Sequence, residues 1–144
     1  MKVLVLDGPN LNLLGEREPE IYGSLTPKDI KAALRDVFPE LNLDFFQSNH
    51  EGVMIDKLHA ARKSHDGVVL NAAAFTHYSY ALRDAIAAID LPVVEVHLSN
   101  PDEREDFRKV NVIRDVCAAH FQGEGIDSYK KALDYFSNLT GYDW

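Results

Sequence analysis

A chain of 144 residues, 46% of them hydrophobic, is long enough for one compact domain with a sizeable core, and we expect a single domain over 1–144. Asp and Glu outnumber Lys and Arg by 23 to 15, a formal net charge of −8, which argues against nucleic acid as a partner. No apolar run approaches the roughly 20 residues of a membrane span. Cys117 is the only cysteine, so no intrachain disulfide can form and a cytoplasmic location is expected.

Short apolar segments alternate with longer segments of helical periodicity. The expected strands are Lys2–Leu6, Leu43–Gln47, Gly67–Leu70, Val93–Val96 and Val116–Phe121. The expected helices begin after caps at Thr26, Asn49 and Ser79, and a last helix is expected over about Ser128–Ser137. This alternation predicts parallel strands joined by right-handed crossovers, in a flavodoxin-like, doubly wound α/β fold with strand order 2-1-3-4-5.

Chemically capable residues follow the strands that such an order places together. Asp7-Gly8-Pro9-Asn10 follows the first strand, Asn71 ends the third, and His97-Leu98-Ser99-Asn100-Pro101 follows the fourth. Ligands of doubly wound sheets bind beyond the carboxyl ends of the strands, where the order reverses. We therefore expect the functional site at this edge.

The loop from Gly8 to Leu25 is about 18 residues long, a length that is usually functional or disordered. Its leucines make it too apolar for a linker, and it carries Arg17 and Tyr22. The simpler alternative is that Arg17 pairs with a nearby acid and Tyr22 only packs.

Glu95 and His97 lie two residues apart on one strand, hence on one face, where a carboxylate can support a histidine acting as a general acid. A structural histidine at a strand end is the alternative. Asn100 can cap a short helix that Pro101 opens and that runs through Phe107, with Arg104 and Arg108 on one face. Those arginines could equally belong to a salt-bridged surface.

Cofactor motifs are missing from the sequence. The histidines His50, His59, His77 and His97, with Glu95, lack the short paired spacing of common zinc sites. There is also no glycine-rich dinucleotide or triphosphate motif. We expect neither a metal nor another cofactor.

Several separated blocks closely resemble the type II dehydroquinases. They are Gly8–Gly15, Arg17-Glu18-Pro19, Ile21-Tyr22-Gly23, Gln47–Gly52, Asn71 with Thr76-His77 and Ser79, Ala81–Ala85, Glu95–Asn100 and Arg104–Arg108. The resemblance covers most of the chain in the family's order and spacing. It implies cofactor-free elimination of water from 3-dehydroquinate, and the same fold that the strand pattern predicts.

Residue by residue, the resemblance implies that Tyr22 removes the proton beside the substrate ketone, with Arg17 close to it. Asn10 would help to stabilise the enolate, and His97, oriented by Glu95, would protonate the leaving hydroxyl. A free tyrosine has a pKa of about 10, so a base of this type needs a neighbouring cation to favour the phenolate.

The remaining implied residues bind substrate. Asn71 and the backbone of Leu98 and Ser99 would hold the carboxylate, while the ring hydroxyls would meet His77, Arg104 and Arg108. Asp84 would reach the site from a neighbouring subunit of a dodecamer of trimers.

Some positions depart from the family's usual pattern. Asp7 stands where asparagine is common, Ala72-Ala73-Ala74 replaces a stretch richer in Pro and Gly, and Lys109-Val110-Asn111 replaces a run that usually carries His and Ser. Two rivals remain at this stage: a non-catalytic flavodoxin-like binding or signalling module, and a dehydratase or hydrolase acting on another small polyol acid.

Overall fold

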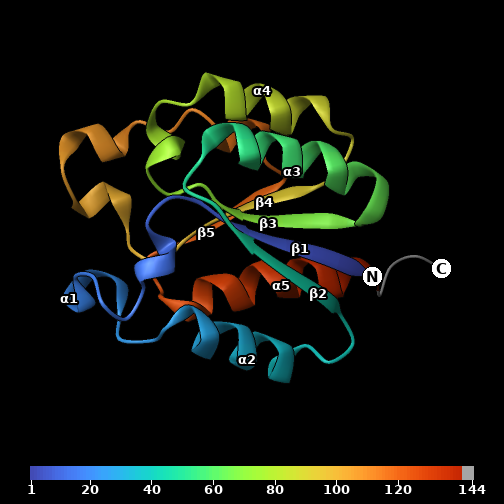
Figure 1. Cartoon of the computed structure of the whole chain (residues 1–144), viewed down its shortest axis with the longest axis horizontal. Coiled ribbons are helices and arrows are strands. Elements are labelled where there is room, and N and C mark those ends of the chain that lie inside the picture. Colours follow the sequence, from blue (N-terminus) through green and yellow to red (C-terminus); the bar gives the residue numbers. More distant parts are fainter. Residues whose placement is uncertain (141–144) are drawn as a thin grey trace.

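The computed structural model describes residues 1–140. Its five strands form one all-parallel sheet in the order β2-β1-β3-β4-β5, which confirms the predicted topology (Figure 1). The strands are β1 (Lys2–Asp7), β2 (Asn42–Gln47), β3 (Gly67–Asn71), β4 (Val93–His97) and β5 (Ala119–Gln122). The expectation of a single domain over residues 1–144 stays a prediction. The last four of these residues lie outside the part that the structure describes.

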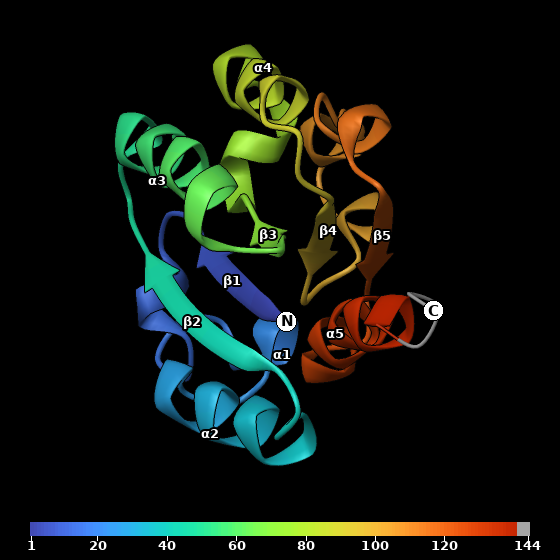
Figure 2. The same ribbon diagram turned by 90° about the vertical axis from the view of Figure 1, so that its right-hand side faces the viewer.

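Helices cover both faces of the sheet. In Figure 2, α3 (Glu51–Ser64) and α4 (Tyr80–Ala88) lie on one face, and α2 (Pro27–Val37) and α5 (Ile126–Thr140) on the other. Side chains alternate along β1 accordingly: Val3 and Val5 belong to one buried cluster, Leu4 and Leu6 to the other. Within residues 1–140, no helix is both long and apolar enough to cross a membrane.

Two of the three predicted helix caps are confirmed. Thr26 and Asp29 form a reciprocal capping box at the start of α2, and the Ser79 hydroxyl accepts from the N–H of Leu82 in α4. The third is wrong, since α3 follows His50. Asn49 Oδ1 instead accepts from the backbone N–H of Asn10 at 2.9 Å, and so ties the end of β2 to the first loop.

The fifth strand begins later than predicted. Val116 belongs to a 3₁₀ turn, η5 (Arg114–Val116), and the ladder with β4 begins only at Ala119. The side-chain oxygen of Asn111 accepts from the backbone N–H groups of Ile113 and Arg114, which stabilises the turn in place of an extended strand.

Both connections at the carboxyl edge contain short helical turns. The first loop holds η1 (Leu11–Leu13) and the single-turn helix α1 (Pro19–Tyr22), and η2 (Ala73–His77) follows β3. The expected helix from Pro101 through Phe107 is wrong. The chain forms two 3₁₀ turns, η3 (Pro101–Glu103) and η4 (Asp106–Lys109), because the backbone of Arg104 between them is extended.

Candidate active site

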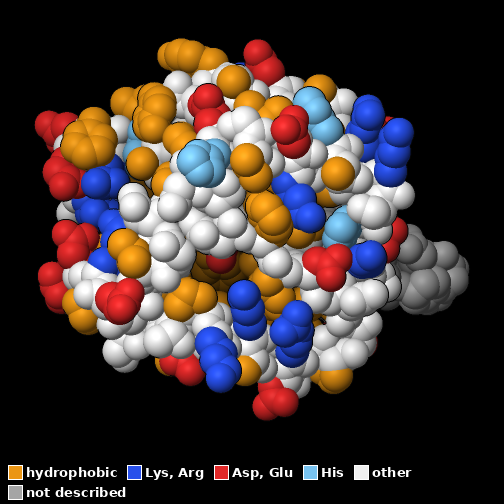
Figure 3. Space-filling view, viewed as in Figure 1, with side chains coloured by type: hydrophobic (Ala, Val, Ile, Leu, Met, Phe, Trp, Pro, Cys, Tyr) orange, Lys and Arg blue, Asp and Glu red, His pale blue; other side chains and the backbone are white. Residues whose placement is uncertain are grey.

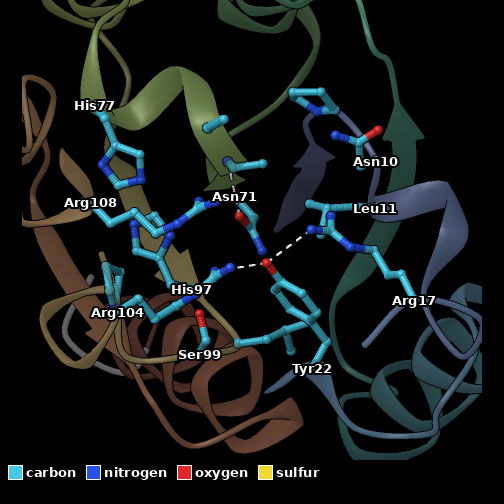
Figure 4. Close-up of a pocket in the computed structure, with 15 residues that line it drawn as sticks. Asn10, Leu11, Arg17, Tyr22, Asn71, His77, His97, Ser99, Arg104 and Arg108 are labelled. Carbon is cyan, nitrogen blue, oxygen red and sulfur yellow. Dashed lines mark hydrogen bonds between the residues drawn. The ribbon is translucent and has the colours of Figure 1, made fainter. Parts of the chain in front are cut away.

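One pocket lies at the carboxyl edge of the sheet, where the strand order reverses. Its walls come from the ends of β1, β3 and β4, from the first loop, and from η2 to η4 (Figure 4). Eleven of the twelve residues predicted for the site line this pocket or contact a residue that does. Glu95 does not line it but is hydrogen-bonded to His97. The ten that line it are Asn10, Arg17, Tyr22, Asn71, His77, His97, Leu98, Ser99, Arg104 and Arg108.

Tyr22 projects into this pocket from the end of α1, between two arginines (Figure 4). Arg17 donates to its hydroxyl oxygen at 3.0 Å and Arg104 at 2.7 Å. Their guanidinium carbons also lie 4.2 and 5.2 Å from the ring centroid. Two guanidinium groups thus converge on one phenol oxygen. Arg17 lies farther from the nearest acid, Glu18, at 3.8 Å, so its phenol contact is the closer one.

His97 and Glu95 form a buried pair at the end of β4. The Nε2 atom of His97 lies 2.6 Å from Oε2 of Glu95, and the Glu95 side chain is fully buried. An ionised Glu95 fixes Nε2 as the protonated nitrogen, which leaves Nδ1 as the atom that can exchange a proton with a ligand.

Sequence reasoning missed two further partners of Glu95. Asn111 donates to the same Oε2 atom at 2.6 Å, and Arg114 donates from Nε to Oε1 at 2.9 Å. Burial opposes the ionisation of Glu95, but hydrogen bonds and charges from His97 and Arg114 outweigh it and lower the pKa of Glu95 to about 2. The only signal in the sequence was that Lys109-Val110-Asn111 replaces a run that usually carries His and Ser.

A second missed network holds Asn71. Its amide group donates to the hydroxyl of Tyr129 at 3.0 Å, and Tyr129 in turn donates to Asp7 at 2.7 Å. The Asn71 oxygen accepts from the N–H of Ala73, so both ends of the amide are fixed. Burial raises the pKa of Asp7 to about 6, against the lowering effect of Tyr129.

His77 lies beside Arg108 and His97 on one side of the pocket (Figure 4). Its Nδ1 lies 2.7 Å from the carbonyl oxygen of Val110, which leaves Nε2 for a ligand. Burial, joined by the positive charges of nearby side chains, lowers the pKa of His77. Arg108 also pairs with Glu105 at 2.5 Å.

Close approach and backbone strain shape the walls. A Cβ atom on Gly8 would lie 2.7 Å from the carbonyl oxygen of Ala72, so only glycine fits where the ends of β1 and β3 meet. Asn10 and Ala73 both line the pocket with positive φ, of 69° and 52°. Asparagine tolerates this conformation, whereas alanine is strained in it.

Asp84 is the one predicted site residue that the chain does not bring to its own pocket. It lies exposed on α4 and does not line the cavity. Its neighbour Arg83 pairs with Asp115 instead. Among residues 1–140, no three His, Cys, Asp or Glu side chains are grouped as a metal site would require. The absence of a cofactor remains a prediction.

Comparison with known proteins decides the family. A model of the class II dehydroquinases matches residues 1–137. The chain belongs to the class II dehydroquinase family. Dehydroquinases are hydro-lyases that act on 3-dehydroquinate, and the chain is an enzyme of this class, so the non-catalytic rival is wrong.

Relatives of the dehydroquinase match nearly its whole length. A 3-dehydroquinate dehydratase of Bacillus licheniformis is 54% identical over 140 residues, which cover 96% of this chain and 97% of the relative. The crystal structure of a type II dehydroquinase from Butyrivibrio crossotus superposes with a TM-score of 0.93 at 42% identity, covering 95% and 97% of the two chains. One from Propionibacterium acnes gives 0.91 at 37%, covering 95% and 96%.

Proposed function

We propose that this dehydroquinase removes water from 3-dehydroquinate by an anti elimination through an enolate, with Tyr22 as the base and His97 as the acid. The Tyr22 phenolate takes a proton from the carbon beside the ketone. The electron pair moves into an enolate, which then expels the hydroxyl group as water with the proton of His97. The product is the conjugated enone 3-dehydroshikimate, and solvent returns both side chains to their starting states.

The observation that carries this proposal is the pair of guanidinium groups on the Tyr22 hydroxyl, facing His97 across one pocket. Arg17 and Arg104 come from distant parts of the chain and both donate to the same oxygen. A tyrosine that only packed in the wall would not need two partly buried cations at its hydroxyl. Together they also provide the local positive charge that an anionic substrate requires on a protein of net charge −8.

The remaining pocket residues suit the rest of the substrate. Asn71, held by Tyr129 and Ala73, and the backbone of Leu98 and Ser99 would bind the carboxylate, and His77 and Arg108 would bind ring hydroxyls. Asn10 would stabilise the enolate oxygen. Arg104 would act on the tyrosine as well as on the substrate, because its Nη1 atom donates a hydrogen bond to the Tyr22 hydroxyl.

We also propose that subunits assemble as a dodecamer of trimers and that Asp84 completes a neighbour's pocket. Supporting this, large hydrophobic side chains are exposed beside the site: Tyr78, Tyr80, Phe107 and Val110 are 54–69% exposed. Figure 3 shows hydrophobic side chains gathered over the start of α4 and the adjacent turns. An apolar surface of this kind is typical of a subunit interface. The cytoplasmic location stays a prediction.

Turnover of 3-dehydroquinate, followed by the ultraviolet absorbance of the enone, tests the mechanism. Tyr22→Phe should fold and bind substrate but lose nearly all turnover, since a phenyl ring accepts no proton. A loss of only a few-fold would place the base elsewhere. Protein treated exhaustively with a chelator should keep full activity, and activity restored by one metal would overturn the cofactor-free mechanism.

A further inference from the structure

The carboxylate of Glu95 is held at both oxygens, although its side chain is fully buried on a central strand. Oε2 receives His97 and Asn111, each at 2.6 Å, and Oε1 receives Arg114 at 2.9 Å. A buried carboxylate with histidine as its only partner would be poorly compensated, and it would be free to rotate. Arg114 supplies the balancing charge, and the two donors fix the plane of the carboxylate.

Asn111 can present only its amide nitrogen, a donor, to Glu95. Its oxygen accepts from the backbone N–H groups of Ile113 at 3.0 Å and Arg114 at 2.8 Å, so the nitrogen must point the other way. The same side chain therefore holds η5 in place and aims Arg114 at the carboxylate.

Arg114 also contacts the end of β5. Its Nη2 donates to Gln122 at 2.6 Å, and Gln122 donates to Asn100 at 3.1 Å and Asp102 at 3.2 Å. Asn100 caps η3, and the residue that follows this turn is Arg104, which donates to Tyr22. A continuous polar path thus runs from the proposed acid to the turn that precedes the arginine on the proposed base.

We propose that Arg114, aimed by Asn111, is a positioning residue that holds the Glu95 carboxylate ionised and correctly oriented for His97 and, through Gln122, fixes the turn before Arg104. The inference rests on the proposed role of His97 as the acid. Arg114 does not line the pocket, so its effect must pass through Glu95 and Gln122. Partners of this kind orient the groups that touch the substrate.

Other ionisable groups surround the pair. Cys117 lies near Glu95, Arg114 and Asp115, and burial raises the pKa of its thiol to about 12, so it stays neutral. Asp115 pairs with Arg83. On the pocket side, His97 faces His77, Arg104 and Arg108. Arg114 is therefore the cation bonded directly to Glu95 on the side away from the substrate.

Arg114→Met is the first test. We expect kcat to fall by about 10- to 100-fold, as for a small misplacement of a reacting group, with little change in KM. Without the arginine, burial should raise the pKa of Glu95 from its value of about 2, so the acid limb of the kcat profile should move to higher pH. Asp115→Asn is the matched control, because it changes a charge in the same turn that does not contact Glu95, and it should leave both quantities unchanged.

A double-mutant cycle with Glu95→Gln shows whether Arg114 acts through Glu95. If it does, Arg114→Met should cost far less kcat in the Glu95→Gln background than alone. Arg114→Lys, which keeps the charge but loses the fork, should restore the acid limb more fully than kcat. Independent, multiplicative losses, or an unmoved acid limb, would overturn the proposal.

Two further results separate the possible failures. Should Arg114→Met not fold, Asn111→Leu, which removes the second donor to Glu95, enters the same cycle, and additivity there would equally overturn the proposal. If Glu95→Gln and His97→Ala themselves leave kcat unchanged, the proposed acid is wrong. If those two matter and Arg114 does not, only the positioning role is wrong.

Discussion

Arg104 donates a hydrogen bond of 2.7 Å to the hydroxyl oxygen of Tyr22, although the two residues are 82 positions apart in sequence. It lies on the opposite side of the phenol from Arg17 (Figure 4). The family resemblance alone gave Arg104 a part in binding the substrate ring. The geometry adds a direct contact with the proposed base, and it distinguishes Arg104 from Arg108, which lines the pocket and pairs with Glu105.

Arg104→Met should therefore lower kcat by about 10- to 100-fold, the range expected for loss of a hydrogen bond from a charged donor. Arg108→Met should act mainly on KM, because Arg108 does not touch the tyrosine. Steady-state kinetics of the two variants provide the comparison. If both variants lost kcat/KM equally and kept kcat unchanged, Arg104 would have a role in substrate binding only.

The order of the strands and the edge that holds the pocket followed from local sequence pattern, whereas the individual pocket residues followed from the resemblance to the type II dehydroquinases. Apolar runs marked the strands, and the polar residues at their ends marked one edge of the sheet. The networks behind the site did not follow. Tyr129 reaches Asp7 across 122 residues, and nothing in the helical pattern of α5 distinguishes a tyrosine that packs from one that also donates a hydrogen bond.

The predictions of local structure that were wrong have a similar cause. Arg104 and Arg108 have helical spacing, but the helix breaks where the Arg104 backbone is extended and its side chain reaches Tyr22. Asn49 has the chemistry of a cap, yet its oxygen is used by Asn10 of the first loop. In both cases a contact across the fold outweighs a local preference.

His97→Ala should slow the expulsion of hydroxide by about 100-fold or more, and Glu95→Gln should do so more mildly. A substrate analogue with a better leaving group needs less protonation, so it should partly rescue His97→Ala. Single-turnover rates with both substrates measure this. Equal damage with either leaving group would assign His97 to positioning.

Asp7→Asn should stabilise the protein at neutral pH. The pKa of Asp7 is raised from 3.8 to about 6, so its contribution to stability is full below about pH 4 and is lost as the pH rises through 6. Asparagine still accepts from Tyr129 but never ionises. The variant should therefore match the wild type near pH 4 and exceed it by about 3 kcal/mol above pH 7. Urea unfolding at pH 4, 6 and 8 checks the trend, and a constant difference would contradict it.

Ala73→Gly should leave stability unchanged or raise it, contrary to the usual effect of glycine. Ala73 has φ of 52°, and relief of this conformation, about 1 kcal/mol, offsets the greater entropy of the unfolded glycine chain. Ala72→Gly is the matched control. Ala72 is fully buried with an ordinary φ of −76°, so that variant should lose about 1 kcal/mol. Thermal unfolding of both variants gives the comparison, and equal losses would show that Ala73 is not strained.

Asp84 provides the sharpest test of a shared site. It is exposed on α4, outside the pocket of its own chain, near the exposed Tyr80. If it completes a neighbour's site, Asp84→Ala and Tyr22→Phe carry complementary defects. Each variant should be poor alone, yet co-refolding equal amounts should create sites with Tyr22 from one chain and Asp84 from the other.

With random assembly, roughly a quarter of the sites would then be intact, and activity should recover to about that fraction of the wild type. Mixing the two assembled variants without subunit exchange should restore nothing, which controls for trivial reactivation. A co-refolded mixture with only the average activity of its parents would show that the site is built within one chain. Asp84 would then be a surface carboxylate whose exposed interactions contribute little to stability.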